Sequence, residues 1–137
     1  MTDTIEYCKE NGLRITGNLR VILHALTEAR LPLSLQELEQ DTKVNAICDR
    51  ATVYRTLQRL ESIGLLRRLN FANSAAKFTL NTGDKHKEYL ICRSCGKVEE
   101  LDIACPVHSL ERKISEEKGF SEMSHELTFY GLCSSCQ

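Results

Sequence analysis

The chain has 137 residues, a hydrophobic content of 42% and a formal net charge of −1 at pH 7. This length is enough for one substantial hydrophobic core or two small ones. No stretch approaches the ~18 consecutive apolar residues of a membrane span, and the start lacks the basic and apolar regions of a signal peptide, so we expect a cytoplasmic protein.

The charge is divided unevenly along the chain. Residues 1–80 carry eleven Lys and Arg against nine Asp and Glu, whereas residues 81–137 carry seven against ten. The first half therefore repels an anionic partner less than the second half does. Because the polar, turn-rich residues 81–84 separate two patterned regions, we predict a domain at 1–80, a hinge at 81–84 and a second domain at 85–137.

The first half begins with two predicted helices. Apolar residues recur at helical spacing between Asn18 and Thr27. Further on, Ser34-Leu-Gln-Glu37 matches a capping box. In this motif the Ser hydroxyl accepts a hydrogen bond from a first-turn amide and the Glu side chain reaches back, so a second helix is expected to begin there.

A third helix is predicted from Arg50 to about Ile63. Asp49 can cap its first turn, and Gly64 ends it. One side of this helix carries an apolar stripe, typical of a helix packed on a small core. The stripe consists of Val53, Leu57, Leu60 and Ile63.

A β-hairpin is predicted after the third helix. Its strands cover residues 65–71 and 77–80, with a polar turn at 72–74. Three helices followed by a hairpin form a winged helix-turn-helix, in which the third helix can enter the major groove of DNA. The fold class is thus α+β, with an N-terminal winged helix.

Four residues are candidates for DNA contact. Tyr54 and Arg55, with Thr52 beside them, lie largely outside the apolar stripe. Arg reads guanine O6 and N7, and an aromatic ring packs against the thymine methyl. Arg14 lies just before the first long helix, where its side chain would be placed to enter a minor groove of DNA. The negative potential of a minor groove attracts arginine. The alternative is an ordinary solvated helix face with Tyr54 half buried in a small bundle.

The second half contains two Cys-x-x-Cys steps, which predict a structural zinc site. They are Cys92–Cys95 and Cys133–Cys136, with 37 residues between them. Each step directs two thiolates at one centre, and four soft ligands in a tetrahedron suit zinc. The long gap implies folded structure between the steps. A single step could instead be a redox pair, but neither lies in the βαβ context of such motifs.

Three further cysteines, Cys8, Cys48 and Cys105, complete a total of seven. An odd number of cysteines argues against complete disulfide pairing, and a reducing compartment favours metal ligation. We expect these three to be small buried apolar residues, because that is the usual environment of a free cysteine.

Four parts of the chain carry a recognisable pattern: Gly12–Thr16 with Arg20, Ala51–Leu57, Leu90–Lys97, and His125 ahead of Tyr130–Cys133. Together they resemble the ferric uptake regulator family of bacterial metal-responsive repressors. The resemblance implies a homodimer whose N-terminal winged helix binds AT-rich operator DNA and whose small α/β C-terminal domain provides dimerisation. It also implies DNA contacts for Arg14, Tyr54 and Arg55 and a structural zinc on the four paired cysteines.

A regulatory metal site is predicted in the second domain. Alternation along a strand places His86 and Glu88 on one face. By the resemblance, these two residues, His108 and His125 form a regulatory site, whose imidazoles and carboxylate suit zinc, or Fe(II), Mn(II) or Co(II) with added water. Cys105, one helical turn before His108, is a candidate to replace or join it. The alternative is that His108 is an exposed helix residue and His125 a hydrogen-bonded strand residue.

The interdomain sensing site of many relatives is dismantled in this chain. Pro32, Thr79, Lys87 and Tyr89 stand where the resemblance places metal ligands. Peroxide sensing by metal-catalysed histidine oxidation is therefore the less favoured variant within the family, because relatives perform it at that site.

The prediction is a metal-dependent repressor of metal-homeostasis genes that senses Fe(II) or Zn(II), binds double-stranded operator DNA, and has neither a membrane partner nor a small-molecule substrate. The alternatives are a peroxide-responsive regulator and a zinc-stapled protein-interaction module. An enzyme is not expected. His86-x-Glu88 followed by a cysteine pair superficially resembles a zinc deaminase. However, the pair begins only four residues after Glu88 and lacks the preceding proline.

Overall fold

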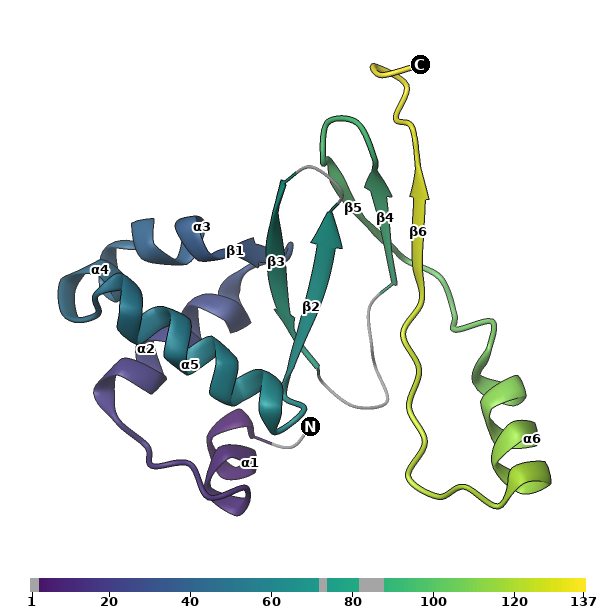
Figure 1. Cartoon of the computed structure of the whole chain (residues 1–137), viewed down its shortest axis with the longest axis horizontal. Helices are drawn as coiled ribbons and strands as arrows, with labels where there is room; N and C mark the ends of the chain where they lie inside the picture. Colours follow the sequence, from purple (N-terminus) through teal and green to yellow (C-terminus); the bar gives the residue numbers. More distant parts are fainter. Residues whose placement is uncertain (1–2, 72–73, 82–87) are drawn as a thin grey trace. The chain divides into compact units, whose positions relative to one another are not determined.

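The computed structural model describes residues 3–71, 74–81 and 88–137 (Figure 1). The chain forms two compact units, Met1–His86 (unit 1) and Lys87–Gln137 (unit 2). Residues 82–84 of the predicted hinge lie outside the described residues, so the proposed domain limits stay a prediction. Among the described residues, no helix combines the length and apolar character needed to cross a membrane.

Five helices are described in unit 1, where three were predicted. The predicted helices correspond to α2, α3 and α5. The two additional helices have only seven and six residues, too few for a clear periodic pattern. The helices are α1 (Thr4–Glu10), α2 (Gly17–Glu28), α3 (Leu35–Gln40), α4 (Thr42–Ile47) and α5 (Arg50–Ser62).

Local hydrogen bonds explain where α3 and α5 begin. The predicted capping box of α3 is confirmed: the Glu37 amide donates to Ser34 Oγ at 3.1 Å, and the Ser34 amide donates to Glu37 Oε2 at 2.9 Å. At α5, the Thr52 amide donates to Asp49 Oδ1 at 2.7 Å. Hydrogen bonds from the side chain and amide of Thr52 also lower the pKa of the Asp49 carboxyl. Both helices therefore start where their capping residues predict.

The end of α5 depends on Gly64, which has a φ of 79° in the left-handed region. The Leu65 amide donates to the Leu60 carbonyl at 3.1 Å, and the Gly64 amide donates to the Glu61 carbonyl at 3.0 Å. These two bonds form a Schellman motif, in which glycine avoids the strain of a side chain at positive φ. The chain consequently leaves α5 and enters the hairpin at this point.

The hairpin and a short first strand form a three-stranded antiparallel sheet in the order β1-β3-β2. The Arg68 guanidinium ties the hairpin to α5, since its Nε lies 2.9 Å from Glu61 Oε2. Within the hairpin, the Arg68 Cζ lies 5.1 Å from the Phe78 ring centroid. The strands are β1 (Leu33–Ser34), β2 (Leu66–Phe71) and β3 (Ser74–Leu80).

Unit 1 closes around a contiguous apolar core. Val53, Leu57 and Leu60 of the predicted stripe are buried, and Ile63 packs against the cluster. Cys8 and Cys48 are also buried in this core, as expected, and burial raises the pKa of both thiols. These two cysteines are packing residues.

Unit 2 contains one helix and a three-stranded sheet in the order β5-β4-β6. The central strand β4 pairs antiparallel with β5 and parallel with β6. A parallel neighbour requires a crossover, and α6 lies within that connection. None of the eleven residues of α6 is buried, and Figure 1 shows the helix standing away from the sheet. The elements are β4 (Glu88–Cys92), β5 (Val98–Leu101), α6 (His108–Lys118) and β6 (Thr128–Gly131).

Candidate functional site

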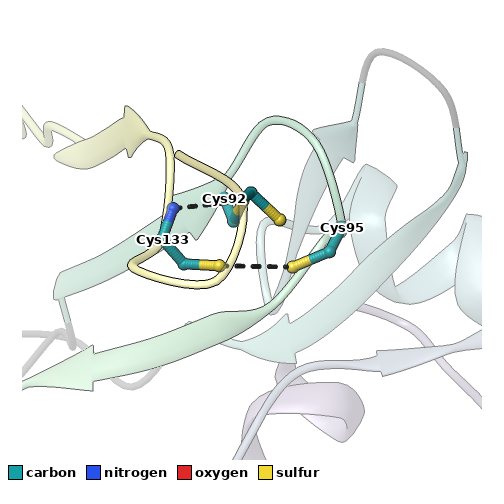
Figure 2. A group of neighbouring side chains, drawn as sticks. Cys92, Cys95 and Cys133 are labelled. Atoms are coloured by element: carbon teal, nitrogen blue, oxygen red, sulfur yellow. Dashed lines mark hydrogen bonds between the residues drawn. The ribbon is translucent and has the colours of Figure 1, made fainter.

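The sheet of unit 2 brings the two Cys-x-x-Cys steps together. Cys92 is the last residue of β4, and Cys133 follows β6 by two residues. Cys92 pairs with Gly131 in the parallel ladder, so both strands deliver their cysteines to the same edge (Figure 2). The ligand atoms of Cys92, Cys95, Cys133 and Cys136 all lie within 4.8 Å of one another.

The sulfur geometry of these four cysteines fits a tetrahedral zinc. Cys95 Sγ and Cys133 Sγ are 3.7 Å apart, and the Cys133 amide donates to Cys92 Sγ at 3.4 Å. Zinc–sulfur bonds of about 2.3 Å at tetrahedral angles place neighbouring sulfurs about 3.8 Å apart. The site therefore needs little rearrangement to hold zinc.

Two thiols of the cluster have pKa values shifted in opposite directions. Hydrogen bonds from the backbone amides of Cys95 and then Cys133 lower the pKa of Cys92 to about 6. A side-chain hydrogen bond with Cys133 is the main cause that raises the pKa of Cys136 to about 12. One thiolate thus forms readily while another thiol keeps its proton. A divalent cation stabilises all four thiolates, because thiolates rather than thiols are the ligands.

A second group of side chains converges on His125. Its Nε2 lies 3.0 Å from Cys105 Sγ, and its Nδ1 contacts Glu111 Oε2. The His125 and Glu111 side chains are each only 19% exposed. Glu111 comes from the first turn of α6, Cys105 from the segment before that helix, and His125 from the segment before β6. The grouping therefore depends on how α6 sits between two irregular segments.

The residues predicted to form the regulatory metal site differ in their burial and in the elements that carry them. His86 lies outside the described residues, Glu88 is buried at the start of β4, and His108 is exposed at the start of α6. The predicted helical turn from Cys105 to His108 is wrong, because α6 begins at His108 and Cys105 precedes it. Instead, Cys105 reaches His125 through tertiary folding. Sequence reasoning did not single out Glu111, although its place one turn after His108 was a usable signal.

The regulatory set of His86, Glu88, His108 and His125 stays a prediction. Across the described ranges 3–71, 74–81 and 88–137, the four paired cysteines are the only group of three or more His, Cys, Asp or Glu ligands close enough to hold a metal. Tyr89, which is predicted to stand in place of a metal ligand, is 1% exposed and thus serves as a packing residue.

The candidate DNA-contacting residues lie at the surface of unit 1. Tyr54 is 47% exposed, and its hydroxyl accepts a hydrogen bond from Gln58 Nε2 at 3.2 Å along the same face of α5. Arg55 and Arg14 are exposed, the latter between α1 and α2. Thr52 is half-buried, and its side chain forms a hydrogen bond with Asp49, the residue that caps α5. The outward face of α5 thus exposes Tyr54 and Arg55 to solvent, while its other face fills the core.

Comparison with known proteins places these features in one family. The chain matches the ferric uptake regulator family over residues 10–130. The ferric uptake regulation protein of Neisseria meningitidis is 33% identical over 98% of this chain and 94% of its own length. The structure of the ferric uptake regulator from Pseudomonas aeruginosa with manganese is 28% identical, with a TM-score of 0.75 over 98% of this chain and 99% of that one.

A third similar protein is the Vibrio cholerae ferric uptake regulator, whose crystal structure is 27% identical, with a TM-score of 0.69 over 96% of this chain and 100% of that one. Both structures align over nearly the whole chain, so the likeness extends over both compact units and is not limited to the winged helix. The chain therefore belongs to the ferric uptake regulator family, a family of metal-responsive transcription regulators.

Proposed function

We propose that this chain is a cytoplasmic, homodimeric repressor of metal-homeostasis genes that binds operator DNA when a divalent metal occupies unit 2. The observation that carries the proposal is the division of α5 into two faces. Val53, Leu57 and Leu60 anchor the helix in the core, while Tyr54 and Arg55 remain exposed beside each other. A helix held in this way can present base-reading side chains to the major groove.

The four cysteines are proposed to hold a structural zinc. They are the ends of two neighbouring strands, and their ligand atoms already lie within 4.8 Å of one another. In a unit with a small apolar core, a metal with four protein ligands contributes folding free energy directly. Zinc is favoured because all four donors are soft sulfur atoms.

A second copy of this chain is the proposed partner of unit 2. An amphipathic helix with no buried residue and a sheet with apolar side chains at its surface both expose area that water solvates poorly. A two-fold dimer covers the same patch on both copies at once. The large exposed hydrophobic residues in the described part of unit 2 are Leu90, Ile103, Leu110, Ile114, Phe120, Phe129, Tyr130 and Leu132.

The regulatory metal is proposed to bind around His125, with His86, Glu88 and His108 as further ligands and Zn(II) or Fe(II) as the ion. Similar structures support metal binding in this family, since that from Pseudomonas aeruginosa contains manganese and that from Francisella tularensis contains iron. Metal in unit 2 would favour the arrangement of two winged helices that matches two half-sites on DNA.

The DNA-binding part of the proposal is tested at Arg55. Operator sequences are first selected from a random duplex pool by the wild-type protein in the presence of zinc. Binding of Arg55→Ala is then measured on a selected duplex and on a scrambled one. If Arg55 reads a base edge, the variant loses about 1–3 kcal/mol on the selected duplex and little on the scrambled one.

Arg59→Ala is the matched control, because Arg59 is another exposed arginine one turn further along α5. If Arg59 contacts only phosphate, its removal weakens both duplexes alike and lowers the salt dependence of binding. Equal losses on both duplexes for Arg55→Ala would remove Arg55 from base readout. Unchanged binding by both variants would argue for the alternative of a solvated helix face.

A further inference from the structure

The contacts of His125 are arranged as they are in a metal-binding histidine. A histidine that ligates a metal through one ring nitrogen usually donates the N–H of the other nitrogen to a carboxylate or carbonyl, which sets the tautomer and orients the ring. Glu111 Oε2 occupies that position at Nδ1. The remaining nitrogen, Nε2, faces a sulfur atom, Cys105 Sγ, at 3.0 Å.

The distance between the two donor atoms is close to that required by a shared metal. With zinc–nitrogen and zinc–sulfur bonds of about 2.0 and 2.3 Å at a tetrahedral angle, the two atoms lie about 3.5 Å apart. The observed 3.0 Å therefore has to widen by about half an ångström. Cys105 lies in the irregular segment between β5 and α6, and His125 lies in the irregular segment before β6, so no helix or strand has to be broken.

We propose that Cys105 Sγ and His125 Nε2 ligate a divalent metal in unit 2, with Glu111 as the positioning residue that holds the His125 ring. This inference rests on the proposed metal-dependent function and revises its sensing site. Water would complete the coordination sphere. Because a thiolate favours softer ions, the sensed metal is Zn(II), or Co(II) in its place, rather than Mn(II).

The pair of Cys105 and His125 also differs from the four-cysteine site in a way that suits exchange of the bound metal with metal in solution. The four-cysteine site has four protein sulfurs at the ends of paired strands. The Cys105–His125 pair has only two protein donors, and both lie on irregular segments. If the two sites of one unit differ in affinity, the tighter site holds its metal permanently. The occupancy of the weaker site then follows the concentration of free metal.

The test is a Co(II) titration of the full-length protein whose four-cysteine site holds one zinc per chain. Co(II) bound by a thiolate gives a near-ultraviolet sulfur-to-metal charge-transfer band, and the visible d–d bands report tetrahedral binding. We expect one Co(II) per chain with both signatures, while elemental analysis shows that the zinc content stays constant. Added zinc should displace the cobalt from this site.

Three variants separate the roles of the residues. Cys105→Ser should lose the charge-transfer band, and His125→Ala should lose both the band and the binding. Glu111→Gln should keep the band but weaken the affinity by about 10- to 100-fold, as expected for loss of a carboxylate behind a ligating histidine. The matched control is Cys48→Ser, a free cysteine buried in unit 1, which should leave the titration unchanged.

The outcomes distinguish this inference from the proposed function. If Cys105→Ser binds Co(II) with the wild-type spectrum and affinity while His125→Ala does not, Cys105 is only a hydrogen-bond partner and the inference fails, but a sensing site at His125 stands. If wild-type protein binds no second metal, the inference and the predicted regulatory site both fail. The DNA-binding role is measured separately with Arg55→Ala and does not depend on this result.

Discussion

The two compact units of the chain achieve stability in different ways. Among the residues that the structure describes, unit 1 encloses a cluster of fifteen buried residues, most of them from its helices and its hairpin. In unit 2, the buried apolar residues are Tyr89, Ile91, Cys92 and Val98, and α6 buries none of its side chains. Unit 1 thus has a core of its own, whereas unit 2 exposes much of the apolar surface that would normally form one.

This difference follows in part from size. Unit 2 has only 51 residues, and domains of this size generally need a metal, disulfides or oligomerisation to be stable. Its four-cysteine cluster is suited to a metal, and its exposed apolar surface is suited to oligomerisation. Anything that binds only the folded form raises its stability, so the zinc and the second copy proposed above would both stabilise the folded form of unit 2. A unit of this kind is suited to sensing, and a self-contained unit is suited to DNA readout.

The largest expected effect is the loss of the structural metal. Cys92→Ser should remove the zinc and unfold unit 2, since a structural zinc contributes on the order of ~10 kcal/mol to folding. Unit 1 should keep its helices, because its core does not include the metal site. Calorimetry and circular dichroism, combined with elemental analysis, would show one transition lost and one retained.

Cys48→Ser is the control for this experiment, because it removes a thiol without touching the four-cysteine cluster. It should retain one zinc per chain. A Cys92→Ser protein that lacks zinc but keeps its dimer and both unfolding transitions would show that unit 2 has a sufficient core of its own.

A smaller effect is expected when a charge is placed on the exposed apolar face of α6. Ile114 is 39% exposed, and Ile114→Asp should weaken dimerisation by roughly ten- to a hundredfold if a second copy buries this side chain, equivalent to about 1.5–3 kcal/mol. Sedimentation equilibrium over a range of concentrations measures the change. Ile47→Asp, at a residue of unit 1 that is 52% exposed, is the matched control and should leave the dimer intact.

The smallest effect should be confined to unit 1. Ser34→Ala removes the hydroxyl that accepts the Glu37 amide in the capping box of α3, and it should cost about 0.5–2 kcal/mol. Urea unfolding followed by probes specific to each unit would show a shift for unit 1 alone, with or without metal. Ser121→Ala, at an exposed serine of unit 2, should change neither midpoint. A shift in the metal-dependent transition of unit 2 would mean that the two units fold together.

Local sequence signals predicted much of the fold. The capping residues, the apolar stripe of α5 and the turn at Gly64 act within one or two turns of chain, so their effect can be recognised without a structure. The short helices α1 and α4 were missed because six or seven residues give too few repeats for a periodic pattern. The helical turn expected between Cys105 and His108 is absent, because α6 begins only at His108, where no side chain caps it.

The four-cysteine cluster was predictable because the spacing within each Cys-x-x-Cys step already directs two sulfurs to one point, and four thiolates have a strong preference for zinc. The meeting of Cys105, Glu111 and His125 was not predictable in this way. These residues are separated by up to 20 positions, and only the packing of α6 between two irregular segments determines which side chain faces His125. Sequence by itself thus determined the elements and the soft metal site, because both depend on short-range geometry. Tertiary structure alone decided the partners of His125, because contacts between irregular segments depend on the path of the whole unit.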